Sequence, residues 1–325
     1  PAAPLRLDQR DNRSGVMSTN GTLFDVEVRT AEFPSTRYQG SKRKLAGAII
    51  ERFSGLNFTT VLDAFGGTGA VSHALKAIGK RVTYNDILSF NHQVGLALIE
   101  NDRRTLSNEK VEYVLDHQPG LTYDDFIERT FDGIYFTREE NRWLDVVSAN
   151  IRTLDDRYER AIAWFALFQS ALAKRPYNLF HRSNLSMRTS DVPRTFGNKV
   201  TWDRPFEDHF RRFVASANRA VLDGTGTCRA LCRDAGEIEG DFDLVYIDPP
   251  YLNARGIGVD YQRFYHFLEG LIDAPNWSAR IDRRYKHLPL RRDLQPWSDR
   301  NAVRAAFAAL FERFQRAILV VSYRS

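Results

Sequence analysis

Short apolar runs alternate with helix-like stretches along the first third of the chain. Residues 60–63 form an apolar run that ends at a carboxylate, residues 70–78 have the pattern of a helix, and residues 81–84 form a second apolar run. Strands that alternate with helices are typical of a parallel α/β sheet. The pattern therefore predicts a strand, a glycine-rich turn, a helix and a second strand.

The pattern changes between about residues 137 and 222. Two long helical stretches, 138–152 and 155–174, lead into an irregular basic segment, and a further helix is expected at 205–222. The α/β pattern then resumes with three strands and a helix, at residues 227–232, 242–247, 317–321 and 301–314. We therefore expect an α/β domain that is split by a mainly helical insert.

Composition narrows the class of protein. With 325 residues, 43% of them apolar, the chain can bury a large core, and no apolar run approaches the roughly 18 residues of a membrane helix. Residues 1–22 are polar and lack the apolar stretch of a secretory signal. The net charge of +5 is compatible with a polyanionic partner.

The two cysteines, Cys228 and Cys232, exclude a disulfide scaffold. Their spacing lacks the second pair that a zinc site requires, so we expect both to pack in the core and we expect no metal. This cysteine usage favours a reducing, cytoplasmic location.

The tetrapeptide Asp248-Pro249-Pro250-Tyr251 directly follows a predicted strand and carries the clearest chemistry. A carboxylate can accept a hydrogen bond from an exocyclic amine. Proline has a fixed φ and no N–H, so that a carbonyl can be held towards a ligand, and a tyrosine ring can stack on a base. The same string is also compatible with a simple strand-ending turn.

A glycine turn, Phe65-Gly66-Gly67-Thr68-Gly69, follows Asp63 at the end of the first strand. Glycines allow a ligand to approach the backbone, and the spacing departs from the G-x-G-x-x-G pattern of a pyrophosphate site. Asp86 ends the next strand, a position that commonly binds ribose hydroxyls, although a helix N-cap is the alternative.

Upstream, the segment from Tyr38 to Lys42 joins an aromatic ring, a glycine and a cation before a helix. Such a segment can bind a ligand carboxylate, and a solvated helix start is the alternative.

Together these stretches resemble the Dam-like, D12 class DNA N6-adenine methyltransferases. The resemblance rests on residues 38–42, 63–69, Asp86, Asp234 and 248–251, and on their order, which is that of the α group of these enzymes. It covers most of residues 36–325. It implies a Rossmann-like, S-adenosylmethionine-dependent methyltransferase sheet with an inserted, mainly helical target-recognition domain.

The resemblance also implies the binding residues of the cofactor S-adenosylmethionine. Asp86 would bind its ribose, Tyr38 and Lys42 would lie near its methionine end, and Asp234 would lie near its adenine. The full set is Tyr38, Lys42, Asp63, Phe65, Gly66, Gly67, Gly69, Asp86, Asp234 and Asp248.

By the same resemblance, the chain would methylate an adenine flipped out of double-stranded DNA. The Asp248 carboxylate and the Pro249 carbonyl would hold N6, and Tyr251 would stack on the base. No metal and no covalent intermediate are needed. The expected setting is a restriction–modification or related defence system, with a cognate restriction endonuclease acting on the same sequence.

Three alternatives remain open at this point. Cytosine-N4 enzymes more often carry serine in place of Asp248, which argues against that reaction. The residues alone do not separate DNA from RNA adenine. A catalytically silent DNA-binding module is the third, and the intact Asp248, Tyr251 and glycine turn argue against it.

Two basic segments are expected to contact DNA, because arginine and lysine bind phosphates and arginine and asparagine read base edges. One lies in the insert and the other follows residue 280. The residues expected at the interface are Arg182, Asn184, Arg188, Arg194, Lys199, Arg283, Arg284 and Lys286. Residues 252–262 are expected to form a mobile loop that closes on the flipped base.

These expectations divide the chain into four parts. Residues 1–32 form a flexible tail, 33–136 the cofactor-binding part, 137–222 the helical target-recognition insert, and 223–325 the catalytic part. A doubly wound sheet normally continues beyond such a final strand, so we expect C-terminal strands to be missing from this chain.

Overall fold

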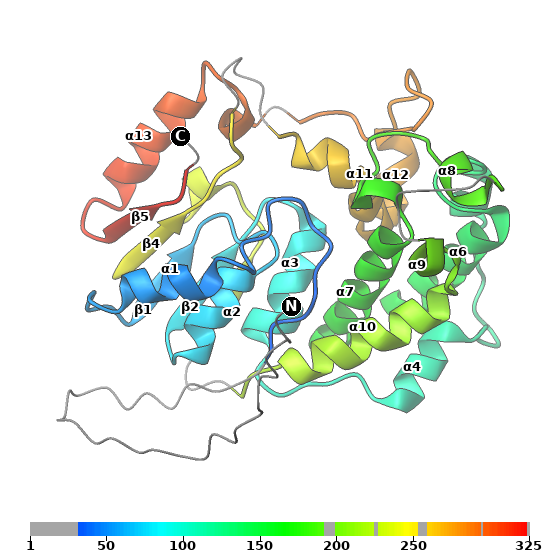
Figure 1. The fold of residues 1–325 in the computed structure, drawn as a ribbon, viewed down its shortest axis with the longest axis horizontal. Coiled ribbons are helices and arrows are strands. Elements are labelled where there is room, and N and C mark those ends of the chain that lie inside the picture. Colours follow the sequence, from blue (N-terminus) through cyan, green and yellow to red (C-terminus); the bar gives the residue numbers. More distant parts are fainter. Residues whose placement is uncertain (1–31, 192–198, 224–226, 253–258, 294, 324–325) are drawn as a thin grey trace, which may run out of the picture.

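The computed structural model describes residues 32–191, 199–223, 227–252, 259–293 and 295–323. Within these ranges the strands form one parallel sheet in the spatial order β3-β2-β1-β4-β5 (Figure 1). The strands are β1 Thr60–Asp63, β2 Arg81–Asn85, β3 Arg229–Leu231, β4 Leu244–Ile247 and β5 Ile318–Val321. The prediction of a Rossmann-like parallel α/β sheet is confirmed.

The strand order reverses between β1 and β4. Val61 of β1 pairs with Val82 of β2 on one side and with Leu244 of β4 on the other. The chain proceeds outward from β1 through β2 to β3, and in the opposite direction from β4 to β5. Such a reversal opens a crevice at the carboxyl ends of the two central strands. Asp63 ends β1 and Asp248 follows β4 at this edge.

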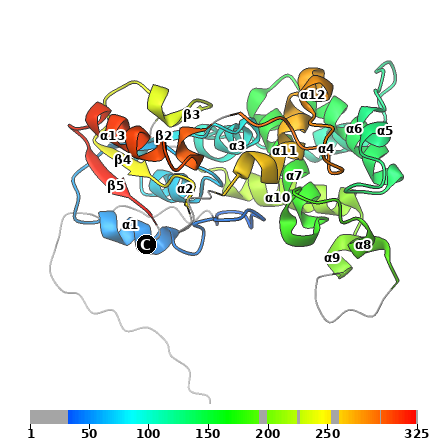
Figure 2. The ribbon, with the colours of Figure 1, turned by 90° about the horizontal axis from the view of Figure 1, so that it is seen from above.

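Both faces of the sheet are covered. Helices α1 Ala46–Phe53, α2 Ala70–Ala77 and α3 Ser89–Gly95 pack on one side, and α13 Val303–Arg313 on the other (Figure 2). Successive side chains of a strand point to opposite faces, so Val61 packs in one cluster and Leu62 in the other. Burial on both faces explains why the strands appear in the sequence as unbroken apolar runs.

The remaining helices gather to one side of the sheet (Figure 1). They are α4 Asn108–Leu115, α5 Phe126–Thr130, α6 Arg138–Arg152, α7 Arg157–Ala173, α8 Ser186–Thr189, α9 Lys199–Asp203, α10 Phe206–Ala220, α11 Tyr261–Ile272 and α12 Ala274–Arg280. Helix α7 is buried continuously over residues 161–173, because α3, α6 and α10 surround it. That enclosure explains why residues 161–173 are mostly apolar around the whole helix.

The core is continuous from the sheet into these helices. One apolar cluster joins Val82 in the sheet to Phe165 in α7 and Phe267 in α11. Helices α4 and α5 precede residue 137 but pack on α6, and Trp277 of α12 contacts Phe131 with ring centroids 5.0 Å apart. The division of the chain at residues 137 and 222 stays a prediction, and the packing shows that the parts share one core.

Several predicted boundaries are confirmed to within two residues. The strand expected at 227–232 covers Arg229–Leu231. The loop expected at 252–262 ends earlier, because the Asp260 carboxylate accepts a hydrogen bond from Arg263 N (2.9 Å) and starts α11 at Tyr261. Residues 253–258 of that loop, and residues 1–31 of the expected tail, lie outside the described residues.

Cys228 is buried, as expected, but Cys232, one residue beyond β3, is exposed. The expectation of a buried Cys232 is therefore wrong, because β3 ends at Leu231 and the chain leaves the sheet there. In the described ranges, no helix is long and apolar enough to cross a bilayer.

Candidate active site

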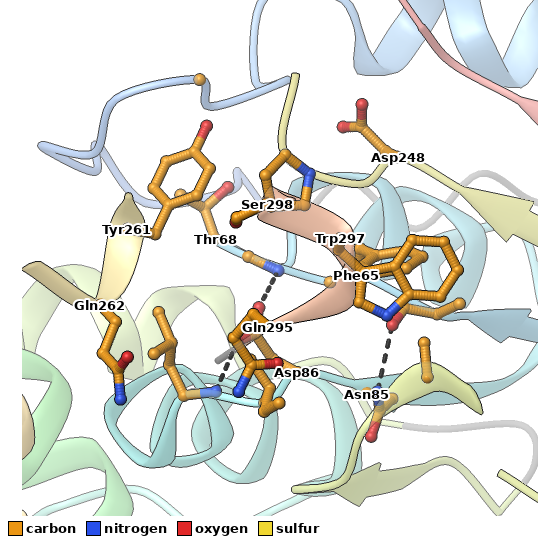
Figure 3. A pocket seen from close by; sticks show the side chains of 18 of the residues that line it. Phe65, Thr68, Asn85, Asp86, Asp248, Tyr261, Gln262, Gln295, Trp297 and Ser298 are labelled. Atoms are coloured by element: carbon orange, nitrogen blue, oxygen red, sulfur yellow. Dashed lines mark hydrogen bonds between the residues drawn. The ribbon is translucent and has the colours of Figure 1, made fainter. Parts of the chain in front are cut away.

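A pocket of about 450 Å³ opens at the carboxyl ends of the central strands (Figure 3). Its walls come from the segment before α1, the glycine turn after β1, the end of β2 and the start of the loop after β4. The predicted site residues that line it are Tyr38, Lys42, Asp63, Phe65, Gly66, Gly67, Asp86, Asp248 and Pro250. Segments far apart in the sequence thus meet at the predicted edge of the sheet.

Four other predicted residues lie behind this wall. Gly69, Asp234, Pro249 and Tyr251 do not line the pocket, but each is a chain neighbour of a residue that does. Gly69 has a φ of 76° and precedes α2. Asp234 begins a short turn by accepting a hydrogen bond from Gly236 N (2.8 Å).

Tyr84 determines the shape of the glycine turn. A Cβ atom on Gly66 would lie 2.0 Å from the Tyr84 ring. The Tyr84 hydroxyl donates to the carbonyl oxygens of Gly67 (2.7 Å) and Asn91 (3.1 Å). Gly67 itself has a φ of 52°, which favours glycine. The turn therefore presents bare backbone to the pocket.

Asp86 links the glycine turn to the start of α3. Its carboxylate accepts hydrogen bonds from Gly67 N (2.9 Å) and Leu88 N (2.8 Å) (Figure 3), and a third from Asn91 Nδ2 (3.1 Å). Burial raises the pKa of Asp86 to about 6. Carboxylate oxygens can accept several hydrogen bonds, so Asp86 supports α3 and can still accept one from a ligand hydroxyl.

Asp63 is buried at the floor of the pocket with one oxygen unpaired. Its Oδ2 accepts a hydrogen bond from Ser72 Oγ (2.6 Å), while Oδ1 has no partner among the described residues. Burial, together with the nearby charges of Asp248 and Asp86, raises the pKa of Asp63 to about 7, although the Ser72 hydroxyl and the Phe65 backbone N–H act to lower it. A buried unpaired carboxylate oxygen beside a pocket suits a positively charged hydrogen-bond donor of a ligand.

Lys42, Asp248 and Tyr251 form a compact polar cluster. Lys42 Nζ donates to Asp248 Oδ2 (2.5 Å) and to the Tyr251 hydroxyl (2.8 Å), and that hydroxyl donates to Asp248 Oδ1 (2.7 Å). Although burial alone would lower it, these hydrogen bonds raise the pKa of Lys42 above its ordinary value. Both oxygens of Asp248 are therefore held in fixed directions at the pocket wall.

Sequence reasoning missed Trp297, which closes the pocket from a segment beyond α12. The buried indole packs edge-on against Phe65 with ring centroids 4.7 Å apart (Figure 3), and Nε1 donates to Asp234 Oδ1 (3.4 Å). The one sequence signal was a tryptophan within a polar stretch. Its place opposite the glycine turn depends on tertiary structure.

Tyr261 was also missed. It begins α11, lines the pocket, and stacks parallel to Tyr38 with ring centroids 5.5 Å apart. Tyr38 in turn stacks on Tyr265 at 4.6 Å. A Cβ atom on Gly40 would lie 2.6 Å from the Tyr261 hydroxyl, so α11 packs closely on the segment before α1.

Two of the residues expected to contact DNA make hydrogen bonds within the fold. Arg188 is buried and donates to Glu140 Oε1 (2.6 Å) and Oε2 (3.0 Å), and Lys174 Nζ also pairs with Glu140 (2.8 Å). Asn184 Oδ1 accepts a hydrogen bond from the buried Arg175. Sequence alone does not distinguish these inward-pointing side chains from exposed ones.

Other residues of that set are exposed. Arg182 and Lys199 lie on the surface of the helical part, and Arg194 lies outside the described residues. Arg283, Arg284 and Lys286 are exposed in residues 282–288, which we call the basic loop. The loop is closed by a hydrogen bond from Asp282 N to Pro289 O (2.7 Å), and Arg284 pairs with Asp282 (2.7 Å).

In the described part of the chain, no three His, Cys, Asp or Glu side chains gather in a way that could hold a metal ion.

Comparison with known proteins gives consistent matches. The sequence profile of the D12 class N6 adenine-specific DNA methyltransferase family matches residues 38–291. The type II methyltransferase M2.HphI of Haemophilus parahaemolyticus is 30% identical over 249 residues, which span 74% of this chain and 72% of that protein. The type II methyltransferase M.CviAII of Paramecium bursaria Chlorella virus 1 is 23% identical over 236 residues, or 69% and 66% of the two chains.

Proposed function

The chain belongs to the D12 class N6 adenine-specific DNA methyltransferases, and from this premise we propose that it transfers a methyl group from S-adenosylmethionine to N6 of an adenine flipped out of double-stranded DNA. The observation that carries the proposal is the position of Asp248. Its carboxylate stands at the wall of a pocket that is also lined by a bare glycine turn, by the buried carboxylate of Asp63 and by the half-buried carboxylate of Asp86.

The lining residues fit S-adenosylmethionine, which supplies an activated methyl group on a sulfonium. The unpaired Oδ1 of Asp63 suits an ammonium group, and Asp86 suits ribose hydroxyls. Phe65 and Trp297 offer flat apolar walls for an adenine, beside Asp234. Tyr38, Gly66 and Gly67 complete this side of the pocket, with Gly69 shaping the turn behind it.

Asp248 and its neighbours would act on the target amine. The N6 lone pair is delocalised into the ring, so hydrogen bonds to Asp248 and to the Pro249 carbonyl would favour the tetrahedral geometry that can attack a methyl group. Lys42 and Tyr251 orient the carboxylate through the contacts described above. Tyr251 would also stack on the flipped base, and the rigid Pro249-Pro250 pair would hold the backbone in place.

The names of the relatives support a proposal for the setting of this reaction. Both are named type II methyltransferases. We place this chain in a restriction–modification or related defence system, with a cognate restriction endonuclease that acts on the same DNA sequence. Residues 137–222 would carry target recognition, with Arg182 and Lys199 exposed on it. Arg283, Arg284 and Lys286 of the basic loop would contact phosphates.

The test is a methyl-transfer assay with labelled S-adenosylmethionine. Unmethylated double-stranded DNA of varied sequence, and RNA as a second substrate, are incubated with the protein and digested to nucleosides. The expected label is in N6-methyl-2′-deoxyadenosine from DNA. Label in N4-methylcytosine, label from RNA alone, or no label would overturn the proposal. Sequencing that reports methylated positions then gives the recognition sequence.

A further inference from the structure

A segment between α12 and α13 spans the pocket from one side to the other. Residues 290–293 and 295–298, which we call the strap, run from the buried Leu290 to the buried Trp297. Trp297 packs on Phe65 of the glycine turn, and Figure 3 shows both rings on the side of the pocket away from Gln262. Strap residues and the first turn of α11 both line the pocket. The strap therefore joins the wall formed by α11 to the wall formed by the glycine turn.

Two polar pairs join the middle of the strap to the first turn of α11. Gln262 Nε2 donates to Asp293 Oδ2 (2.8 Å), and Asp293 N donates back to Gln262 Oε1 (3.2 Å). Arg292 Nε pairs with Asp260 Oδ2 (3.1 Å), while the other oxygen of Asp260 caps α11. All four residues line the pocket. These contacts therefore close the pocket wall between α11 and the strap.

The middle of the strap is held more weakly than its ends. The side chains of Arg292 and Asp293 are 61% and 62% exposed, and exposed polar pairs contribute little to stability. Leu290 and Trp297 are only 7% and 4% exposed, so each end is fixed by apolar burial. The middle can therefore separate from α11 while both ends stay packed, and this separation opens the pocket.

A ligand needs such an opening to pass, because a pocket of this kind buries most of the surface of the molecule that it holds. We propose that the Gln262–Asp293 pair is a latch that holds the strap closed over S-adenosylmethionine, and that it sets the rates at which this cofactor enters and leaves. The inference rests on the proposed function and adds two positioning residues to it. A closed wall retains the donor and keeps water from the reacting groups.

The substitution Gln262→Glu breaks the latch and leaves the helix intact. It places a second carboxylate within hydrogen-bond distance of Asp293, and the two negative charges repel each other. Glutamate is favourable in the first turn of a helix, so the variant should fold. The added charge alone would attract the cationic cofactor and slow its dissociation. Faster dissociation would therefore report the open strap and not the charge.

A second substitution restores the latch. In the double variant Gln262→Glu/Asp293→Asn the carboxylate and the amide have exchanged places, so both hydrogen bonds can form again. Asp293→Asn alone keeps an acceptor for the Gln262 amide, and should alter the rates less than Gln262→Glu does. Gln315→Glu is the matched control, because it makes the same change at an exposed position after α13 that does not line the pocket.

Rapid filtration with labelled S-adenosylmethionine measures the association and dissociation rate constants of the full chain without DNA. Gln262→Glu should raise both rate constants by about threefold or more, as expected for the loss of a hydrogen-bonded pair that keeps a gate shut. The dissociation constant should change less than either rate constant. The double variant should return both rate constants towards those of the wild type, and Gln315→Glu should leave them unchanged.

The outcomes separate the latch from the function on which it rests. Unchanged rate constants in Gln262→Glu, or no recovery in the double variant, would overturn the latch alone. A rise in the dissociation rate constant with no rise in the association rate constant would mean that Gln262 contacts the cofactor directly, and would also overturn the latch. A wild type that does not bind S-adenosylmethionine would overturn the proposed function, and the latch with it.

Discussion

Asp63 is the residue whose protonation should report on cofactor binding. Its pKa is held near 7, above the ordinary value of 3.8, so its contribution to stability is complete below about pH 4 and is lost as the pH rises through about 7. A cationic ligand group favours the ionised form. We therefore predict that affinity for S-adenosylmethionine increases as the pH rises from roughly 6 to 8, with release of a proton.

Titration calorimetry in buffers of different ionisation enthalpy measures both the affinity and the proton release. Asp63→Asn should bind more weakly and lose most of the pH dependence. A wild-type affinity that stays constant across this range would contradict the assignment of Asp63 to the ammonium group.

Substitution of Gly66 tests how closely the Tyr84 ring packs against the glycine turn. Gly66→Ala places a methyl group against the Tyr84 ring, and should lower the free energy of unfolding by about 2 kcal/mol, as expected for overpacking. Gly47→Ala in α1 is the control, because a Cβ atom there meets nothing within 4 Å and alanine favours a helix. Denaturant melts should show a loss for the first variant only; equal stability of the two would contradict this packing.

The sequence allowed some of these residues to be predicted. Asp248, Asp86 and the glycine turn each follow a strand, and ends of neighbouring parallel strands meet whatever the rest of the fold does. Trp297 and Tyr261 reach the pocket through packing of α11 and of the segment beyond α12, which no local pattern encodes. The burial of Arg188 could not be predicted from the sequence for the same reason, because its partner Glu140 lies 48 positions earlier in the chain.

Among the elements, α6 and α8 are joined by a buried ion cluster. Arg188 of α8 and Lys174 at the end of α7 both pair with Glu140, which also caps α6 through Thr137. Arg188→Ala leaves Glu140 in the interior with one cation fewer, and should destabilise the protein by about 3 kcal/mol or more.

Thermal denaturation of Arg188→Ala, with Arg182→Ala as the control, measures this loss of stability. The exposed Arg182 side chain should have little effect on melting temperature. A loss of DNA affinity in Arg188→Ala without any loss of stability would support the original expectation that Arg188 contacts DNA, and would contradict the structural role.

The predicted bounds of elements were most accurate where the sequence carries a local signal, and were shifted by one or two residues where tertiary contacts set the ends. Helix α6 begins with a capping box of Thr137 and Glu140, a signal that sequence carries, and its predicted bounds are confirmed. Strand β3 is an edge strand of three residues, and its end depends on pairing with β2. Helix α11 begins earlier than expected because Asp260 caps it.

At the scale of the whole molecule, charge on one surface should govern DNA affinity. The double variant Arg283→Ala/Lys286→Ala should weaken binding to all duplexes similarly, and lower the slope of log affinity against log salt by roughly 0.9 for each phosphate that is no longer neutralised. Lys110→Ala in α4, which removes a cation paired with Glu159, is the control. Fluorescence anisotropy across a salt series gives the slopes; an unchanged slope in the double variant would exclude the basic loop from the interface.

The whole fold was predictable to the level of a parallel α/β sheet with added helices. The continuity of the core between the sheet and the added helices could not be predicted. Residues 137–222 were predicted as an insert, and α7 of that segment packs against α3 of the sheet part, so the two share one core. Which apolar faces meet is decided by packing among many similar side chains, and one sequence does not specify it.

The most direct test of the central claim is the single-turnover rate of methyl transfer to DNA by Asp248→Ala, with S-adenosylmethionine affinity measured on the same protein. The carboxylate holds the target amine in this account, so transfer should fall by about a thousandfold or more while donor binding changes little. A variant that still transfers methyl groups at a rate close to the wild type would contradict it.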